Sequence, residues 1–396
     1  MQVTSLRRAL RLGVALVVLA AAAPACAQAP AADVAPRGAV ALPARLTDAE
    51  FWRLVNDLSE PGGYFRSDNF TSNETSFQRV IPQLVETVPR CSVYVGVGPE
   101  QNFTYITALR PPMAFVVDIR RQNMVQHLLY KALMETSPDR AEFLSRLFSR
   151  ARPAGLGPEL SPDSLFRAFT LVDPDSGRFV ANLAQVRDYL ASTKRFALDT
   201  NDLRSLEYVY TAFYLAGPDL TYSFSAGRVG PMWGRRMPTY AELMAETDEE
   251  GRMRSYLASE ELYRTLAEMQ KANLLVPLVG DFGGPKAIRA LGQWLRERGA
   301  TVGTFYTSNV EQYLFQGTDA WRRFYDNVGT MPLDPSSTFV RAVFNFGAFD
   351  PSLQRTGPRS VSLLCPIQAQ VRSAAEGRLS SYYDAALCEG RGIPER

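Results

Sequence analysis

The stretch from residue 91 to residue 121 limits most strongly what this chain can fold into. Its sequence is CSVYVGVGPEQNFTYITALRPPMAFVVDIRR, in which one apolar run ends at Gly96 and Gly98 and a second ends at Asp118. A segment long enough for a helix separates the two runs. Parallel strands need such a crossover connection, which is usually an α-helix. The stretch therefore predicts a β-α-β unit within a sheet that contains parallel strands.

The same unit has the features of a ligand site. Gly96 and Gly98 allow a sharp turn and a close approach of a ligand to the backbone, and the next helix presents free N–H groups there. Asp118 follows Gly98 by twenty positions, where nucleotide-binding folds place an acid that accepts hydrogen bonds from ribose. We therefore expect a cofactor at this turn. The alternative is an ordinary strand-to-helix turn with a solvated aspartate.

A second unit of this kind begins near residue 272. An apolar run over residues 274–279 ends at Gly-Asp-Phe-Gly-Gly, and a helical pattern leads to another strand pattern at residues 301–307. One more strand is predicted from residue 338. Right-handed crossovers place both glycine-rich turns at the same carboxyl edge of the sheet. The predicted fold class is α/β with a mostly parallel sheet.

The segment between these units is mostly helical in pattern and is too long for a simple crossover. We predict that residues 46–150 and 272–350 form the two parts of one α/β domain, and that residues 151–271 form a helical insertion or cap. Within the insertion, TYSFSA at residues 221–226 is predicted as one strand. Residues 351–396 are predicted to be an irregular C-terminal extension.

The start of the chain has the composition of a targeting segment. Arginines precede an apolar run, so residues 1–27 are predicted to be a signal peptide and residues 28–45, rich in Ala and Pro, a disordered linker. Periplasmic or secreted localisation is expected. The pair Arg7–Arg8 leaves the twin-arginine route open, and Cys26 leaves lipidation open as the less favoured alternative. No transmembrane segment is expected in the mature chain.

Composition excludes several classes of function. The 43 basic and 41 acidic side chains give a net charge of +2, so nucleic acid is not an expected partner. Because His127 is the single histidine and no CxxC spacing occurs, no metal site is expected. A hydrolase also lacks support, because there is no GxSxG motif and His127 is poorly placed for a triad. His127 lies in a predicted helix, and its expected role is a surface position or hydrogen-bonded packing.

Export would allow the cysteines to form disulfides. Cys365 and Cys388 could close a local loop near the C-terminus, which would leave Cys91 unpaired. Cys91 is then predicted to be a small core side chain at the start of a buried strand.

The motifs VYVGVGPEQN, VVDIRR and LVGDF resemble, in this order, the skeleton of class I S-adenosylmethionine-dependent methyltransferases. Together with PGGYFRSDNFTSNE, VGDFGGPKAIR and SNVEQYL, they resemble an uncharacterised bacterial family with a methyltransferase-like, Rossmann-type fold, over most of residues 47–350. The resemblance implies S-adenosylmethionine as cofactor, with the glycine-rich turn on its methionine part and Asp118 on its ribose. A residue after the fourth strand would orient the acceptor, and the resemblance points to Asp281 with Phe282 in this catalytic role.

The candidate cofactor-binding residues belong to the first unit: Gly96, Gly98, Glu100, Asn102 and Asp118. Candidate substrate or lid residues lie in a polar, aromatic stretch or just after predicted strands: Tyr64, Asp68, Asn73, Glu74, Arg120, Ser308, Asn309 and Glu311. Glu100 puts an anion at a helix start, which would repel a phosphate and tolerate a cationic amine or a sulfonium. Gln101 replaces the third glycine of GxGxxG, which disfavours a dinucleotide. The structural alternatives are helix caps at Asp281 and Asn309, and a bridge from Arg120 to Asp118 or Glu100.

Two functions follow as hypotheses. The first is an exported methyltransferase-like protein that binds a nucleoside-type cofactor and methylates a small acceptor. The second is a non-catalytic periplasmic ligand-binding or scaffold protein on the same fold. Export conflicts with the first, because the methyl donor is made in the cytosol. Either the fold serves another ligand, or the cofactor travels inside a protein that folds before export, for which the twin-arginine route would serve. Both hypotheses expect a small-molecule partner, and the sequence does not indicate an oligomeric state.

Overall fold

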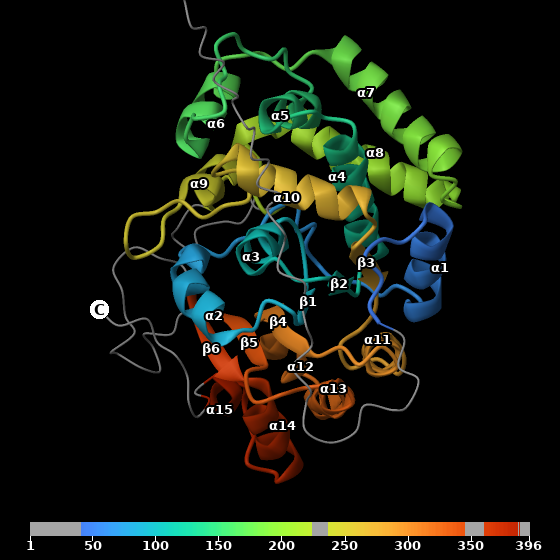
Figure 1. Cartoon of the computed structure of the whole chain (residues 1–396), viewed down its shortest axis with the longest axis vertical. Helices are drawn as coiled ribbons and strands as arrows, with labels where there is room; N and C mark the ends of the chain where they lie inside the picture. Colours follow the sequence, from blue (N-terminus) through green and yellow to red (C-terminus); the bar gives the residue numbers. More distant parts are fainter. Residues whose placement is uncertain (1–40, 224–236, 345–359, 387, 389–396) are drawn as a thin grey trace, which may run out of the picture.

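A computed structural model of the chain describes residues 41–223, 237–344, 360–386 and 388. Within these residues a six-stranded sheet with the order β3-β2-β1-β4-β5-β6 lies at the centre (Figure 1). The strands are β1 Val93–Gly96, β2 Ala114–Asp118, β3 Leu275–Val279, β4 Val302–Ser308, β5 Thr338–Phe344 and β6 Ser360–Pro366. Neighbouring strands pair in parallel except β5 with β6, which are antiparallel. The predicted α/β class and mostly parallel sheet are confirmed.

The direction of the chain across the sheet reverses at β1. Val95 lies opposite Phe115 of β2 on one side and Phe305 of β4 on the other. From β1 the chain proceeds outward to β2 and β3, and then returns to β4 and β5. In open α/β sheets, ligands bind outside the carboxyl ends of the strands at such a reversal. The order of the strands therefore places the expected site between β1 and β4.

The first three strands are buried on both faces, which explains their continuous apolar sequences. Helices α3, α4 and α10 lie on one side of the sheet, and α11 and α13 lie on the other (Figure 1). These helices are α3 Gln101–Leu109, α4 Arg121–Glu135, α10 Glu260–Lys271, α11 Ala287–Arg296 and α13 Ala320–Gly329.

The chain enters the fold through α1, Asp48–Leu58, which packs on β3 and α11. Thr47 caps this helix, and Glu50 completes a capping box. A polar, irregular stretch follows, and then the short helix η1, Phe77–Val80, and α2, Ile81–Thr87. That irregular stretch returns to the sheet at its carboxyl edge, where it forms part of the site.

The region between α4 and β3 is mostly helical. It contains α5 Arg140–Phe148, α6 Pro162–Thr170, α7 Ser176–Asp188, η2 Tyr189–Thr193, α8 Thr200–Ala216, η3 Gly217–Asp219 and α9 Tyr240–Ala245. Helix α4 packs against α8, α10 and β3, and most of its residues are buried as a result. The strand predicted at TYSFSA is absent from Thr221–Ser223, and the remainder of that stretch lies outside the described residues.

The C-terminal part is more regular than the sequence predicted. Strand β6 pairs with β5, Cys365 lies opposite Phe339, and α14 Ile367–Ala375 and α15 Tyr382–Ala386 follow. A disulfide joins Cys365 to Cys388. The prediction of an irregular extension is wrong here, because β6 depends on pairing with a partner strand and its local pattern is too short to indicate this.

Cys91 differs from its prediction as well. It is exposed, precedes β1 and is itself disulfide-bonded, so it is neither a core side chain nor a free thiol. The predicted signal peptide and most of the linker lie outside the described residues. Within the part of the chain that the structure describes, no helix has the length and apolar character needed to cross a membrane.

Candidate functional site

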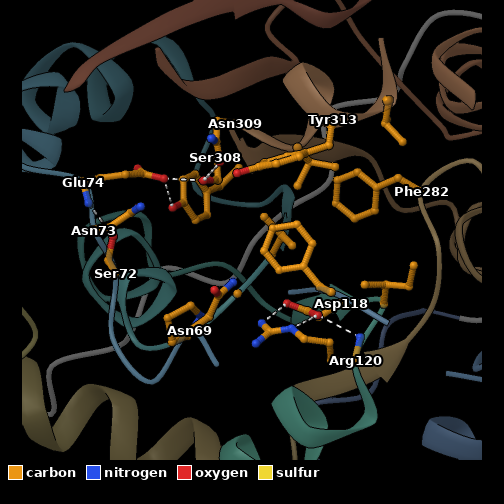
Figure 2. Close-up of a pocket in the computed structure, with 18 of the residues that line it drawn as sticks. Asn69, Ser72, Asn73, Glu74, Asp118, Arg120, Phe282, Ser308, Asn309 and Tyr313 are labelled. Atoms are coloured by element: carbon orange, nitrogen blue, oxygen red, sulfur yellow. Dashed lines mark hydrogen bonds and ion pairs between the residues drawn. The ribbon is translucent and has the colours of Figure 1, made fainter. Parts of the chain in front are cut away.

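A pocket with a cavity volume of about 150 Å³ lies at the carboxyl ends of β1, β2, β3 and β4 (Figure 2). Nine residues that the sequence singled out line it, although they come from distant segments: Asn73, Glu74, Gly98, Asp118, Arg120, Asp281, Phe282, Ser308 and Asn309. Most of them meet because parallel strands end at one edge of the sheet, whereas Asn73 and Glu74 belong to the irregular stretch between α1 and η1. Six other candidates do not line the pocket: Tyr64, Asp68, Gly96, Glu100, Asn102 and Glu311.

The glycine-rich turn after β1 forms one wall of the pocket. Gly98 has a φ of 79°, a conformation that favours glycine, and no atom lies within 4 Å of where its Cβ would be. Asn102 holds the turn, because its Nδ2 lies 2.9 Å from the carbonyl of Val97, 3.2 Å from that of Gly98 and 2.7 Å from that of Pro99. Asn102 therefore shapes the turn from inside the protein.

His127 supports the same turn from α4. Its Nε2 lies 2.9 Å from the Gly98 carbonyl oxygen and must carry the proton, because a carbonyl only accepts. Burial lowers the pKa of His127 to about 4, so the imidazole is neutral at pH 7. Of the two roles that the sequence left open for His127, a surface position and hydrogen-bonded packing, the structure shows the second.

Gly96 is required by the close approach of Asn102. A Cβ at this position would lie 1.9 Å from Asn102 Oδ1 and 2.8 Å from the Tyr94 hydroxyl oxygen. We expect Gly96→Ala to reduce the free energy of unfolding by about 1–3 kcal/mol, the usual cost of overpacking, as measured by urea denaturation. Asn102→Ala removes the closest of these atoms, so the double variant should lose less than the sum of the two single losses. Additive losses would contradict this steric explanation.

Glu100 is not the anion that the sequence predicted. Its side chain is fully buried, Oε1 accepts a hydrogen bond from the Ser72 N–H at 3.2 Å, and Oε2 has no hydrogen-bond partner in the described structure. Burial raises the pKa of Glu100 to about 8, so the group is mostly protonated at pH 7. Glu100 therefore cannot supply the charge that was expected to repel a phosphate.

Asp118 forms a closed ion pair with Arg120, one of the alternatives open from the sequence. The Asp118 Oδ1 accepts from the backbone N–H of Arg120 at 2.9 Å and from its Nε at 3.0 Å, and Oδ2 accepts from Nη2 at 2.8 Å. Arg120 also donates from Nη1 to the carbonyls of Ser67 and Asp68. Both side chains are buried, so their charges compensate each other at one end of the pocket.

Asp281 and Phe282 line the pocket beside Asp118, but they follow the third strand and not the fourth. Asp281 does not cap α11; its Oδ1 accepts from the Gly283 N–H at 2.9 Å within the turn. Glu60 takes the capping position, because its Oε2 lies 3.0 Å from the backbone N of Lys286. In this sheet the fourth strand along the chain is β4, which ends at Ser308. The position that the resemblance gives to the acceptor-facing residue therefore corresponds to Ser308 and its neighbours.

Glu74 lies at the other end of the pocket, across the cavity from Asp118 (Figure 2). It accepts hydrogen bonds from the Tyr306 hydroxyl at 2.8 Å, from Gln101 Nε2 at 2.7 Å and from the Ser308 hydroxyl. Burial raises the pKa of Glu74, and these three donors oppose the shift. Ser308 thus positions Glu74. The helix cap that was the alternative for Asn309 is absent, because its side chain makes no capping hydrogen bond to α12, Val310–Leu314.

Three of the predicted lid residues lie away from the cavity. Tyr64 is 85% exposed, and Asp68 accepts hydrogen bonds from Tyr208 and Ser223. Glu311 forms a buried ion pair with Arg341. The side of its helix on which Glu311 lies depends on tertiary packing, which the sequence pattern could not reveal.

Aromatic side chains that the sequence analysis did not single out make up much of the pocket wall: Phe65, Tyr222, Tyr306 and Tyr313. Phe65 and Tyr313 meet edge to face, with ring centroids 5.0 Å apart. The abundance of aromatic residues near the polar stretch was the available signal, but that stretch has no periodicity that would show which rings turn inward. In the described residues, no group of three or more metal-ligating side chains lies close enough to hold an ion.

A family model with the description "Domain of unknown function (DUF7790)" matches residues 69–154 and 221–358, more than half of the chain. The match contains every residue that lines the pocket except Phe65, and it leaves out α6, α7 and α8. No curated protein matches the chain. The chain therefore belongs to the family described as Domain of unknown function (DUF7790).

Proposed function

We propose that this chain is an exported methyltransferase-like protein that binds a nucleoside-type cofactor, S-adenosylmethionine, and methylates a small acceptor. The observation that supports the proposal most is the meeting of Gly98, Asp118 and Ser308 in one pocket at the reversal of the strand order. In the Rossmann-type folds that the sequence resembles, this edge of the sheet is the nucleotide site.

The residues at the pocket fit such a cofactor in three respects. The backbone of Gly98 borders the cavity, and the space beside its Cα is open. Asp118 Oδ2 accepts only one hydrogen bond in the described structure, so it keeps capacity for a second donor such as a hydroxyl. Phe65, Phe282 and Tyr313 offer aromatic surface for a planar ring.

Bound S-adenosylmethionine would supply an activated methyl group on a sulfonium. The protein would then need to orient the acceptor and exclude water rather than form a covalent bond itself. We assign the orientation of an acceptor to Ser308 and Glu74, because they lie on the β4 side of the pocket. Asp281 and Phe282 lie on the β3 side, so we assign them to the nucleoside end and not to the acceptor.

One observation favours the second hypothesis, a non-catalytic ligand-binding protein. The guanidinium of Arg120 takes up both oxygens of Asp118, so a ribose would have to share that carboxylate. A ligand without ribose would leave the ion pair undisturbed.

Isothermal titration calorimetry of the mature chain with S-adenosylhomocysteine, adenosine and NAD tests the proposal. We expect S-adenosylhomocysteine to bind and Asp118→Ala to weaken it by tenfold or more, about 1.4 kcal/mol, the scale of one hydrogen bond to a charged group. Asp202→Ala is the control, because Asp202 is a buried carboxylate that pairs with the partly exposed Arg121 at 2.6 Å but does not line the pocket. If neither S-adenosylhomocysteine nor adenosine binds, the methyltransferase proposal fails, and the second hypothesis, a non-catalytic ligand-binding protein, is favoured.

A further inference from the structure

We propose that Glu74 is a recognition site for an ammonium group, so that the pocket takes a ligand bearing a protonated amine. This inference rests on the proposed function only in placing the acceptor at this end of the pocket. The recognition itself follows from the surroundings of Glu74.

The first step concerns the charge of Glu74. All three of its partners, Tyr306, Ser308 and Gln101, can donate to a carboxylate, and donors of this kind favour the ionised form. Its Oε2 accepts only the bond from Gln101 in the described structure. A carboxylate oxygen can accept more than one hydrogen bond, so Oε2 can take a further donor.

The second step concerns the absence of a counter-charge. Glu74 is 1% exposed, yet no arginine or lysine among the described residues forms an ion pair with it. Two other buried carboxylates near the sheet edge are paired, Asp118 with Arg120 and Glu311 with Arg341. A third, Glu100, has no counter-charge but does not line the pocket and is mostly protonated at pH 7. Buried charges in proteins are usually paired, and an unpaired one that lines a cavity points to a ligand that brings the opposite charge.

The third step concerns the rest of the cavity wall. The rings of Phe65, Tyr222 and Tyr313 border the same space, and aromatic faces attract ammonium groups. Asn69 also lines the pocket, and its Oδ1 is buried without a hydrogen-bond partner in the described structure. The polar atoms of the pocket wall that can still take a hydrogen bond, Glu74 Oε2 and Asn69 Oδ1, are thus both acceptors. The cationic Arg120 is already paired with Asp118 at the opposite end of the pocket (Figure 2).

The test compares ligands that differ only in charge. Phenethylamine and its neutral counterpart phenethyl alcohol are titrated calorimetrically into the mature chain at pH 7. We expect the amine to bind about tenfold more tightly or better, because a charge-assisted hydrogen bond replaces a neutral one. Glu74→Gln should abolish this preference. Asp281→Asn, which removes a carboxylate at the other end of the pocket, should retain it.

Equal affinity for amine and alcohol, or a preference unchanged in Glu74→Gln, would overturn the inference. The unmodified chain gives a second test that does not depend on the folding of a variant. Lowering the pH protonates Glu74, so amine affinity should fall as the pH drops toward the pKa of Glu74, which burial raises above its ordinary 4.5, while alcohol affinity stays constant. The titratable groups facing Glu74 are Tyr94, Tyr105, Tyr306 and Tyr382, whose pKa values burial raises, so they stay neutral over this range.

Further titrations distinguish two sources of the ammonium. If it belongs to a separate acceptor, phenethylamine will bind alongside S-adenosylhomocysteine. If it belongs to the amino-acid part of the cofactor, the two will compete, and Glu74→Gln will weaken S-adenosylhomocysteine but not methylthioadenosine, which lacks that part. An amine preference at Glu74 without any nucleoside binding would retain this inference and reject the proposed cofactor.

Discussion

Replacing Glu100 by Gln should change how the stability of the protein depends on pH. Between pH 5 and pH 8, the free energy of unfolding of Glu100→Gln should rise relative to that of the unmodified chain by on the order of 4 kcal/mol. Glu100 is fully buried, and burial raises its pKa from 4.5 to about 8. Each unit by which the folded and unfolded pKa values differ corresponds to about 1.4 kcal/mol. The interval from pH 5 to pH 8 covers about three such units.

The direction follows from where the proton is bound. Between pH 4.5 and pH 8 the folded protein keeps a proton on Glu100 that the unfolded chain has released, so the stability contribution present below pH 4.5 is lost as the pH rises. Glutamine does not titrate, so the variant escapes this loss. Three tyrosines that face Glu100, Tyr130, Tyr240 and Tyr256, have pKa values raised above 10 by burial and do not titrate in this window.

Urea denaturation at pH 5, 6, 7 and 8 measures the effect. Glu246, whose pKa burial also raises to about 8, contributes equally to both proteins and cancels in the comparison. Glu297→Gln is the matched control, because its side chain is exposed and keeps a similar environment on unfolding. A stability difference for Glu100→Gln that does not change with pH would mean that Glu100 is ionised in the folded protein.

Arg341→Met should destabilise the protein by about 3–5 kcal/mol, because it leaves the buried carboxylate of Glu311 without a counter-charge. Arg341 Nη2 lies 3.0 Å from Glu311 Oε1, its Nε lies 2.5 Å from Oε2, and both side chains are 1% exposed. Its Nη1 also donates to the Ala385 carbonyl at 3.0 Å, so Arg341 links β5 to α15 by a hydrogen bond.

The double variant Arg341→Met with Glu311→Gln leaves no buried charge and should recover most of the lost stability. Arg322→Met provides the matched control, since Arg322 pairs with Asp319 on the surface and such pairs contribute at most about 1 kcal/mol. Denaturation midpoints of the four proteins give the comparison. No recovery in the double variant would show that the packing of Arg341, and not its charge, dominates.

The sequence predicted those features of the fold that depend on local patterns. Gly96, Gly98 and Asp118 bound a β-α-β unit whose strands are continuous apolar runs, and the unit is present as predicted. The grouping of Gly98, Asp118 and Ser308 at one sheet edge was also predictable, because parallel strands end on the same side.

The errors concern features that depend on contacts between distant segments. The resemblance pointed to Asp281 as the residue after a fourth strand, whereas Asp281 follows β3 and no strand occurs among the described residues between β2 and β3. Glu311 pairs with Arg341, thirty positions away, and no local pattern indicates such a pair. Glu100 turns into the core, because the rotation of its helix is fixed by packing and not by its own spacing. Phe65 lies in an irregular stretch, where periodicity gives no information.

The pairing of β1 with β4 also determines when the protein can acquire its site during synthesis. Val93 lies opposite Val302, so about two hundred residues separate the two strands in the chain. A nascent chain that ends before β4 would hold the glycine-rich turn but would expose one edge of β1, and such edges pair with other chains. Pairing over this distance is also slow, because a long loop must close first. We therefore expect fragments that end before residue 302 to aggregate, and ligand binding to appear only once the whole sheet edge has been made.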